Sequence, residues 1–224
     1  IVMPDAEVDR TIQNTMSSAF GSAGQRCMAC SAVVAVGDSD AFIEKLVEEI
    51  KQIKMGDGMD DVLLTPVITE ESRANAVKYI ELGLEEGAKL LLDGREKAKE
   101  FENGYFLGPT VFDHVTTDMS IAKDEIFAPV LSILRADDLD GALDIVNKSR
   151  FGNSATLFSQ DAKAVRQFRE EAEPGMLGVN VGVPAPMAFF PFSGTKNSFF
   201  GDLHANGKDG VNFYTQKKMI VSRF

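Results

Sequence analysis

The chain has 224 residues, of which 44% are hydrophobic and 25% charged, and its formal net charge is −11 at pH 7. This composition is typical of a globular protein long enough to bury a full core in one or two domains. The acidic balance argues against a nucleic-acid binder, because such proteins neutralise phosphates with clustered Lys and Arg. No apolar run approaches the roughly 20 residues of a membrane-spanning helix. Two cysteines without a paired framework favour a reducing compartment.

Helical and strand patterns alternate along the chain. Apolar residues recur at helical spacing over residues 6–20, where Asp5 is placed to cap the first turn. The unbroken apolar run 32–36 is typical of a buried parallel strand, and an amphipathic helix follows it to residue 53. Further strands are expected at 89–92, 109–112, 129–134, 154–158 and 175–181, with helices between them that end near 87, 146 and 171. This alternation predicts one α/β domain with a three-layer architecture, a mostly parallel sheet flanked by helices.

Residues 184–210 show no periodicity and contain two pairs of adjacent phenylalanines. Long irregular segments inside compact domains are usually functional sites or interfaces. The aromatic pairs are equally compatible with a place in the core. The chain closes on an apolar run, residues 219–221, which is able to add to the edge of a sheet.

The stretch from Phe20 to Cys30 is the strongest candidate for a functional site. Small residues at 21–24 allow a sharp turn that ends beside Cys27. The neighbouring Arg26 favours the thiolate over the thiol, and a helix beginning at Met28 would add to this effect. The pattern therefore predicts a nucleophilic cysteine, although free cysteines are often only small buried apolar residues.

Cys30 completes a C-x-x-C pattern with Cys27, which raises the possibility of a zinc or dithiol site. Such a pattern indicates zinc only with a second pair of ligands at suitable spacing. The two histidines, His114 and His204, lie far apart in the sequence, and nothing near His114 would orient it as a base. We therefore expect no metal ligands, and a non-catalytic dithiol or zinc module stays open as an alternative.

Three motifs resemble those of one enzyme family. Residues 24–29, G-Q-R-C-M-A, resemble the nucleophile segment of aldehyde dehydrogenases, in particular the CoA-acylating methylmalonate-semialdehyde dehydrogenase branch. Residues 123–130, K-D-E-I-F-A-P-V, resemble the E-I-F-G-P-V motif of that family. The segments 191–198, P-F-S-G-T-K-N-S, and 214–218, Y-T-Q-K-K, resemble its C-terminal motifs. The motifs stand in family order, and the likeness covers essentially the whole chain.

The resemblance implies a domain organisation. Residues 1–210 would form the catalytic domain that bears the thiol nucleophile, and 211–224 part of a C-terminal oligomerisation segment. The nucleotide-binding domain would lie mostly before residue 1, since family members are about twice as long. The chain would then be a catalytic half that is inactive alone, from a homo-oligomer of the bacterial cytoplasm or the mitochondrial matrix.

The resemblance also implies a reaction. Cys27 would attack a malonate or methylmalonate semialdehyde, hydride would pass to NAD, and the resulting thioester would lose carbon dioxide and be transferred to CoA. Arg26 would hold the substrate carboxylate, because a guanidinium binds a carboxylate bidentately. Its alternative role is a structural ion pair. Glu125 would bind the nicotinamide ribose and Phe127 would pack near the nicotinamide.

Three positions depart from the family pattern. Ala128, Ser193 and Phe199 replace glycines of the two later motifs, and each adds bulk near the backbone. We therefore expect some loop positions to differ from those of relatives. A second alternative is a branch of the family that hydrolyses its thioester without CoA and uses Arg26 only structurally.

Overall fold

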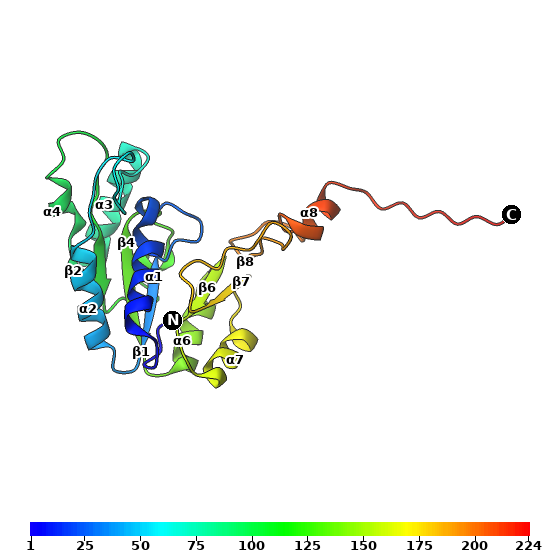
Figure 1. Cartoon of the computed structure of the whole chain (residues 1–224), viewed down its shortest axis with the longest axis horizontal. Coiled ribbons are helices and arrows are strands. Elements are labelled where there is room, and N and C mark those ends of the chain that lie inside the picture. Colours follow the sequence, from blue (N-terminus) through cyan, green and yellow to red (C-terminus); the bar gives the residue numbers. More distant parts are fainter.

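The computed structural model describes residues 1–224 as an α/β fold (Figure 1). Its main sheet has four strands in the order β1-β4-β3-β2. Strands β1, β4 and β3 run parallel, whereas β2 is antiparallel to β3. Their bounds are Ala32–Val36 for β1, Lys89–Leu92 for β2, Thr110–Asp113 for β3 and Val130–Ala136 for β4. The mixed, mostly parallel sheet confirms the expected fold class.

Residues 1–3 join this sheet to a second pair of parallel strands, β6 (Ser154–Leu157) and β7 (Met176–Val179). Val2 bridges Ala35 of β1 on one side and Phe158 on the other. The Val2 amide donates to Val34 O at 2.9 Å, and the Phe158 amide donates to Ile1 O at 2.9 Å. Sequence periodicity missed this connection because three residues are too few to show one.

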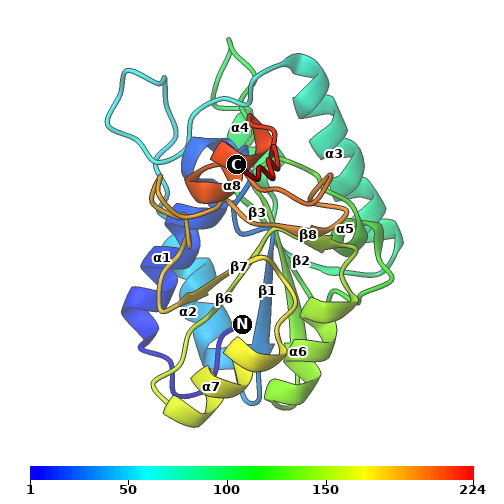
Figure 2. The same cartoon turned by 90° about the vertical axis from the view of Figure 1, so that its right-hand side faces the viewer.

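Helices cover both faces of the main sheet, so the core has two halves (Figure 2). On one face, α1 (Val8–Phe20) and α2 (Asp40–Lys51) pack on residues such as Val33 and Leu131. On the other face, α3 (Glu70–Glu85) and α6 (Leu139–Lys148) contribute Ala76, Ile80 and Ala142 to a cluster that contains Val34 and Leu134. Alternate residues of the strands thus point into opposite layers, which is the period-2 rule of a sheet buried on both sides.

The smaller elements fill the connections. A third cluster packs α7 against α6 and β6. The connection between β2 and β3 contains a short helix, α4. The bounds are Gly94–Ala98 for α4, Ser120–Lys123 for α5, Phe151–Gly152 for β5, Ala162–Glu171 for α7, Thr195–Lys196 for β8 and Gly207–Phe213 for α8.

An ion pair closes the carboxyl ends of β3 and β4. Asp113 is buried and accepts hydrogen bonds from Arg135 Nε at 3.0 Å and Nη2 at 2.8 Å. Burial alone would raise the pKa of Asp113, but the hydrogen bonds from Arg135 and the His114 amide outweigh it and hold the pKa below its ordinary value. Arg135 also reaches Asp40 at 2.6 Å and so ties α2 to the sheet.

The C-terminal region leaves the body of the molecule. Residues 184–210 are mostly irregular, as expected, and beyond α8 residues 215–224 have no regular secondary structure and project outward (Figure 1). Their apolar side chains are exposed, including Met219, Ile220 and Val221. The division at residue 210 stays a prediction. None of the helices is long and apolar enough to cross a membrane.

Candidate active site

The loop that carries Cys27, residues 21–31 and here called the cysteine loop, turns through three left-handed residues. After α1 ends at Phe20, Ser22, Ala23 and Gly24 have φ values of +54°, +55° and +68°. Left-handed backbone is unfavourable for residues with a Cβ, so this turn is strained and must be held by its surroundings. At Gly24 a Cβ would lie 2.5 Å from the carbonyl oxygen of Ala128. The loop therefore packs directly on the backbone of the second motif.

No helix begins at Met28, so the additional effect that such a helix would have on the Cys27 thiol does not arise. Cys27 and Met28 lie in a turn closed by a hydrogen bond from the Ala29 amide to Arg26 O at 3.0 Å. The chain then runs straight into β1 at Ala32, which leaves no room for a helical turn. Helix-terminal amides consequently contribute nothing to the electrostatics around the Cys27 thiol.

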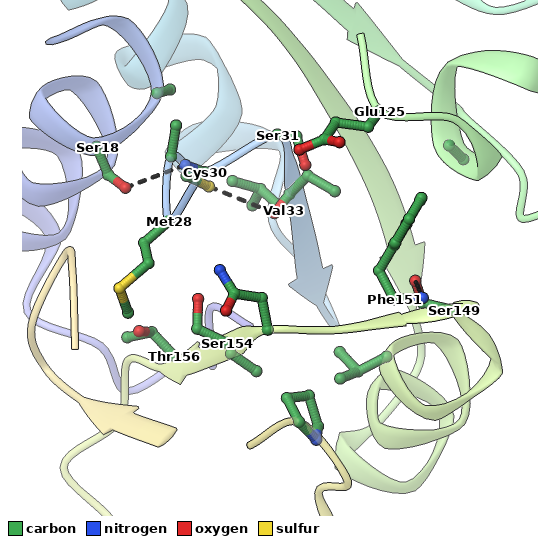
Figure 3. A pocket seen from close by; sticks show the side chains of 18 of the residues that line it. Ser18, Met28, Cys30, Ser31, Val33, Glu125, Ser149, Phe151, Ser154 and Thr156 are labelled. Atoms are coloured by element: carbon green, nitrogen blue, oxygen red, sulfur yellow. Dashed lines mark hydrogen bonds between the residues drawn. The ribbon is translucent and has the colours of Figure 1, made fainter. Parts of the chain in front are cut away.

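Cys27 has an exposed free thiol and lines a cleft of about 1030 Å³. Arg26, Glu125 and Phe127 line the same cleft, so the structure brings the four expected site residues together. Figure 3 looks into this cleft, where Met28 and Cys30 come from the cysteine loop and Ser154 from β6. The cleft extends between the starts of β1 and β6.

Arg26 is held by backbone carbonyls and not by an acid. Its Nη2 donates to Ser17 O at 2.5 Å and Ser18 O at 3.2 Å, which belong to the last turn of α1. Carbonyls at the end of a helix lack partners within the helix, so a guanidinium is a suitable cap. The Nε atom of Arg26 is buried and has no hydrogen-bond partner. The side chain thus retains a donor for which the protein supplies no acceptor.

The segment that carries Glu125 and Phe127 is anchored by its neighbour, Asp124. The Asp124 carboxylate accepts from Tyr79 Oη at 3.0 Å and from Arg150 Nη2 at 2.6 Å. Burial and the hydrogen bond to Asp124 raise the pKa of Tyr79. The Glu125 carboxylate is exposed and takes part in no hydrogen bond or ion pair within the chain. Phe127 is 43% exposed and left-handed, with φ at +57°.

Cys30 differs from Cys27 in its surroundings. Its amide donates to Ser18 Oγ at 3.1 Å and its thiol donates to Ala32 O at 3.4 Å. Burial raises the pKa of the Cys30 thiol, which lowers the reactivity of this thiol at neutral pH. No group of three or more His, Cys, Asp or Glu side chains is placed to hold a metal ion.

The C-terminal motif is fastened to the strand beside the cleft. Ser198 Oγ accepts from the Gly152 amide at 3.0 Å, and the Asn197 amide donates to Arg150 O at 3.0 Å. Lys196 forms an ion pair with Glu173 at 2.6 Å. The first two motifs and residues 191–198 thus meet around one cleft, whereas residues 214–218 are exposed beyond α8.

The residues that replace family glycines are accommodated. Ala128 is buried in the contact with the cysteine loop, and Phe199 packs on the His204 ring with centroids 4.3 Å apart. The backbone of Ser193 and Gly194 packs on Gly175. A side chain at Gly175 would clash with this backbone.

Sequence reasoning missed one residue that touches Cys27. Asn153 lies between β5 and β6, and its Nδ2 donates to Cys27 O at 2.7 Å. The only signal was a polar side chain at the start of an apolar strand, between Gly152 and Ser154. Such a signal does not name a distant partner.

Comparison with known proteins agrees with this geometry. Residues 1–220 match the model of the aldehyde dehydrogenase family. The chain is 64% identical over 225 residues to malonate-semialdehyde dehydrogenase 1 of Geobacillus kaustophilus. This match covers 100% of the chain and 46% of the relative. It is 57% identical to a malonate-semialdehyde dehydrogenase of Bacillus subtilis, again over 46% of the relative. The chain therefore spans about half the length of the curated relatives it matches.

Solved structures show the same likeness. A Sinorhizobium meliloti protein, assigned provisionally as a methylmalonate-semialdehyde dehydrogenase and complexed with NAD, superposes with a TM-score of 0.96 at 41% identity. The methylmalonate-semialdehyde dehydrogenase of Oceanimonas doudoroffii gives 0.96 at 40% identity. Each match covers 100% of this chain and 46% of the other. The resemblance seen in the three motifs is thus confirmed, and the chain belongs to the aldehyde dehydrogenase family.

Proposed function

We propose that this chain supplies the nucleophile and part of the cofactor site of an NAD-dependent, CoA-acylating malonate or methylmalonate semialdehyde dehydrogenase. The observation that carries the proposal is an exposed thiol, Cys27, in a cleft shared with Arg26, Glu125 and Phe127. The names of the relatives, malonate-semialdehyde dehydrogenases at about 60% identity, support the choice of substrate.

Cys27 is placed to act as the nucleophile. Its sulfur makes no hydrogen bond and its backbone N–H has no partner within the chain. As a thiolate, the sulfur adds to the aldehyde carbon and forms a thiohemiacetal. The free N–H of Cys27 is then available to donate to the alkoxide that develops on the former carbonyl oxygen.

The residues at the cleft fit the nicotinamide end of NAD. Glu125 offers two carboxylate oxygens that accept no hydrogen bond in the chain, as binding of ribose hydroxyls requires. Phe127 presents an exposed aromatic face at the same cleft. NAD held by these residues would supply the hydride acceptor that converts a thiohemiacetal of Cys27 into a thioester.

Arg26 is the residue that we assign to the substrate carboxylate. Its buried Nε lacks an acceptor, and an unsatisfied buried donor costs about 1–3 kcal/mol. A carboxylate that reaches this donor would remove that cost. Loss of carbon dioxide from the bound acyl group and attack of the CoA thiol on the thioester carbon then release an acyl-CoA and regenerate the Cys27 thiolate.

A chimera tests this proposal. Residues 1–224 would replace the matching 225 residues of the Geobacillus kaustophilus malonate-semialdehyde dehydrogenase 1. We expect NADH formation from malonate semialdehyde to require CoA and to vanish in the Cys27→Ala chimera. Arg26→Gln should raise the KM for the semialdehyde by about tenfold or more while leaving propanal oxidation nearly unchanged, because propanal has no carboxylate. Full turnover without CoA would instead favour a hydrolysing dehydrogenase.

Thiol chemistry distinguishes the dithiol or zinc alternative. In the enzymatic proposal, iodoacetamide modifies Cys27 selectively and the purified chain contains no stoichiometric zinc. Zinc that is lost when either Cys27 or Cys30 is replaced by alanine would contradict the enzymatic proposal and support a metal module.

A further inference from the structure

The single hydrogen bond of Cys27 comes from Asn153, a residue that lies between β5 and β6 and also lines the cleft. Asn153 Nδ2 donates to Cys27 O at 2.7 Å, and neither the amide nor the sulfur of Cys27 has a partner. The side chains of Gln25 and Arg26 are anchored to Ile68 and to the end of α1, but these contacts do not involve the Cys27 peptide. Two contacts of the loop backbone lie three residues away, one on each side of Cys27. These are the contact of Gly24 with Ala128 and the hydrogen bond from the Cys30 amide to Ser18 Oγ.

Asn153 is itself fixed by the sheet and by the C-terminal motif. Its carbonyl accepts from the Met176 amide at 3.1 Å, in line with the β6–β7 ladder. The preceding Gly152 donates to Ser198 Oγ at 3.0 Å and accepts from the Gly175 amide at 2.9 Å. The backbone that bears the Asn153 side chain is therefore hydrogen-bonded both to the segment 175–176 and to Ser198.

Holding Cys27 O restricts the backbone on both sides of it. A peptide is planar and trans, so the Met28 N–H points away from Asn153 when Cys27 O points toward it. Rotation about the Cα–C bond of Cys27 is then limited, and this limit sets the direction of the sulfur and of the Cys27 N–H relative to the cleft. A carbonyl only accepts, so the contacting Asn153 atom must be the NH₂ donor.

We propose that Asn153 is a positioning residue for the nucleophile. It holds the Cys27 peptide so that the free Cys27 N–H faces the oxygen of a carbonyl that the thiolate attacks. The proposal rests on the proposed role of Cys27. The proposal also connects the C-terminal motif to the reaction. Ser198 of that motif holds Gly152, and the adjacent Asn153 holds Cys27.

The test compares two reactions of Cys27 in the 224-residue chain, with Cys30→Ala as the background. Alkylation by iodoacetamide displaces iodide and creates no oxyanion. Acylation by p-nitrophenyl acetate creates an oxyanion when the thiolate adds to the acetyl carbon. The C–O bond to p-nitrophenolate then breaks, and an acetyl thioester of Cys27 remains. The release of p-nitrophenolate is followed by its absorbance, and both rates are measured over a range of pH.

The variants are Asn153→Leu, of similar size without a donor, and Asn153→Asp, of the same shape with a carboxylate against the carbonyl. The matched control is Asn147→Leu, because Asn147 Nδ2 also donates to a backbone carbonyl, Glu171 O at 2.9 Å, but Asn147 does not line the cleft. Thermal unfolding of every variant shows whether the fold is retained.

We expect both Asn153 variants to slow acylation by about tenfold, a factor that corresponds to about 1.4 kcal/mol, while alkylation changes less than about twofold. Asn147→Leu should change neither rate. Equal losses of both rates, or no loss in folded Asn153 variants, would overturn the positioning role but leave Cys27 as the nucleophile. A Cys27 that is no more reactive than a free thiol toward either reagent would instead contradict the proposed function.

Discussion

Replacing Gly24 by alanine tests whether the cysteine loop is locked against the second motif. An alanine Cβ would lie 2.5 Å from Ala128 O and 2.9 Å from Ala19 O, and the backbone is left-handed with φ at +68°. Left-handed backbone costs an L-residue about 1–2 kcal/mol, and forcing a methyl into a packed site costs about 1–3 kcal/mol more. We therefore expect a loss of about 2–5 kcal/mol in the free energy of unfolding.

The Gly87→Ala variant separates these two effects. Gly87 is also left-handed, with φ at +93°, but a Cβ there meets no atom within 4 Å. Its unfolding free energy should fall by only about 1–2 kcal/mol, which is the dihedral cost alone. Guanidinium unfolding measures the free energy of unfolding of both variants. The rate at which iodoacetamide alkylates Cys27 should also change in the Gly24→Ala variant. If Gly24→Ala were no more destabilising than Gly87→Ala, the loop would not be packed on Ala128 and the convergence of the motifs would be wrong.

Other predictions concern stability, thiol chemistry and activity. Arg135→Met should lower the unfolding free energy by about 3 kcal/mol at pH 7, because Asp113 stays buried without its partner. The lowered pKa of Asp113 contributes stability that is present above about pH 4 and is lost as the pH falls through the native-state pKa, so the deficit in urea unfolding should shrink as the pH is lowered well below 4. A thiol-reactive reagent at pH 7.5 should modify Cys27 well before Cys30, because the pKa of the Cys30 thiol is raised. Simultaneous reaction of both cysteines would contradict the burial of Cys30. The isolated chain should produce negligible NADH from semialdehyde and CoA, and measurable turnover would refute its dependence on residues outside it.

The elements that could be predicted from the sequence are those whose apolar residues follow a helical or strand pattern over the whole element. The run 32–36 became β1 with the same bounds, and the stripe of α2 packs as expected. A helix at Met28, which the sequence left open, does not form because β1 follows at Ala32. The direction of β2 also could not be predicted, since an apolar run does not state whether its neighbour is parallel.

The residues of the candidate site were predicted from the residue types of one loop and from resemblance, and not from periodicity. Arg26, Cys27, Glu125 and Phe127 were placed through motifs, and the structure brings all four to one cleft. The contacts that build the cleft escaped sequence reasoning because they are tertiary. A hydrogen bond from Asn153 to Cys27 O joins positions 126 residues apart, and no local pattern in the chain marks such a pair.

These contacts also separate the reactive atoms from the parts that give stability. The residues that fix the cysteine loop, among them Gly24, Ser18 and Asn153, act on backbone atoms and leave the Cys27 sulfur and N–H without partners. A nucleophile whose sulfur took part in the scaffold would have to break those bonds before each reaction. Here three distant segments hold the backbone, so the thiol stays exposed while the strained turn through Ser22 and Ala23 is kept in place. The contacts that stabilise the loop are thus made by its backbone, and the Cys27 atoms that we propose to react are not among them.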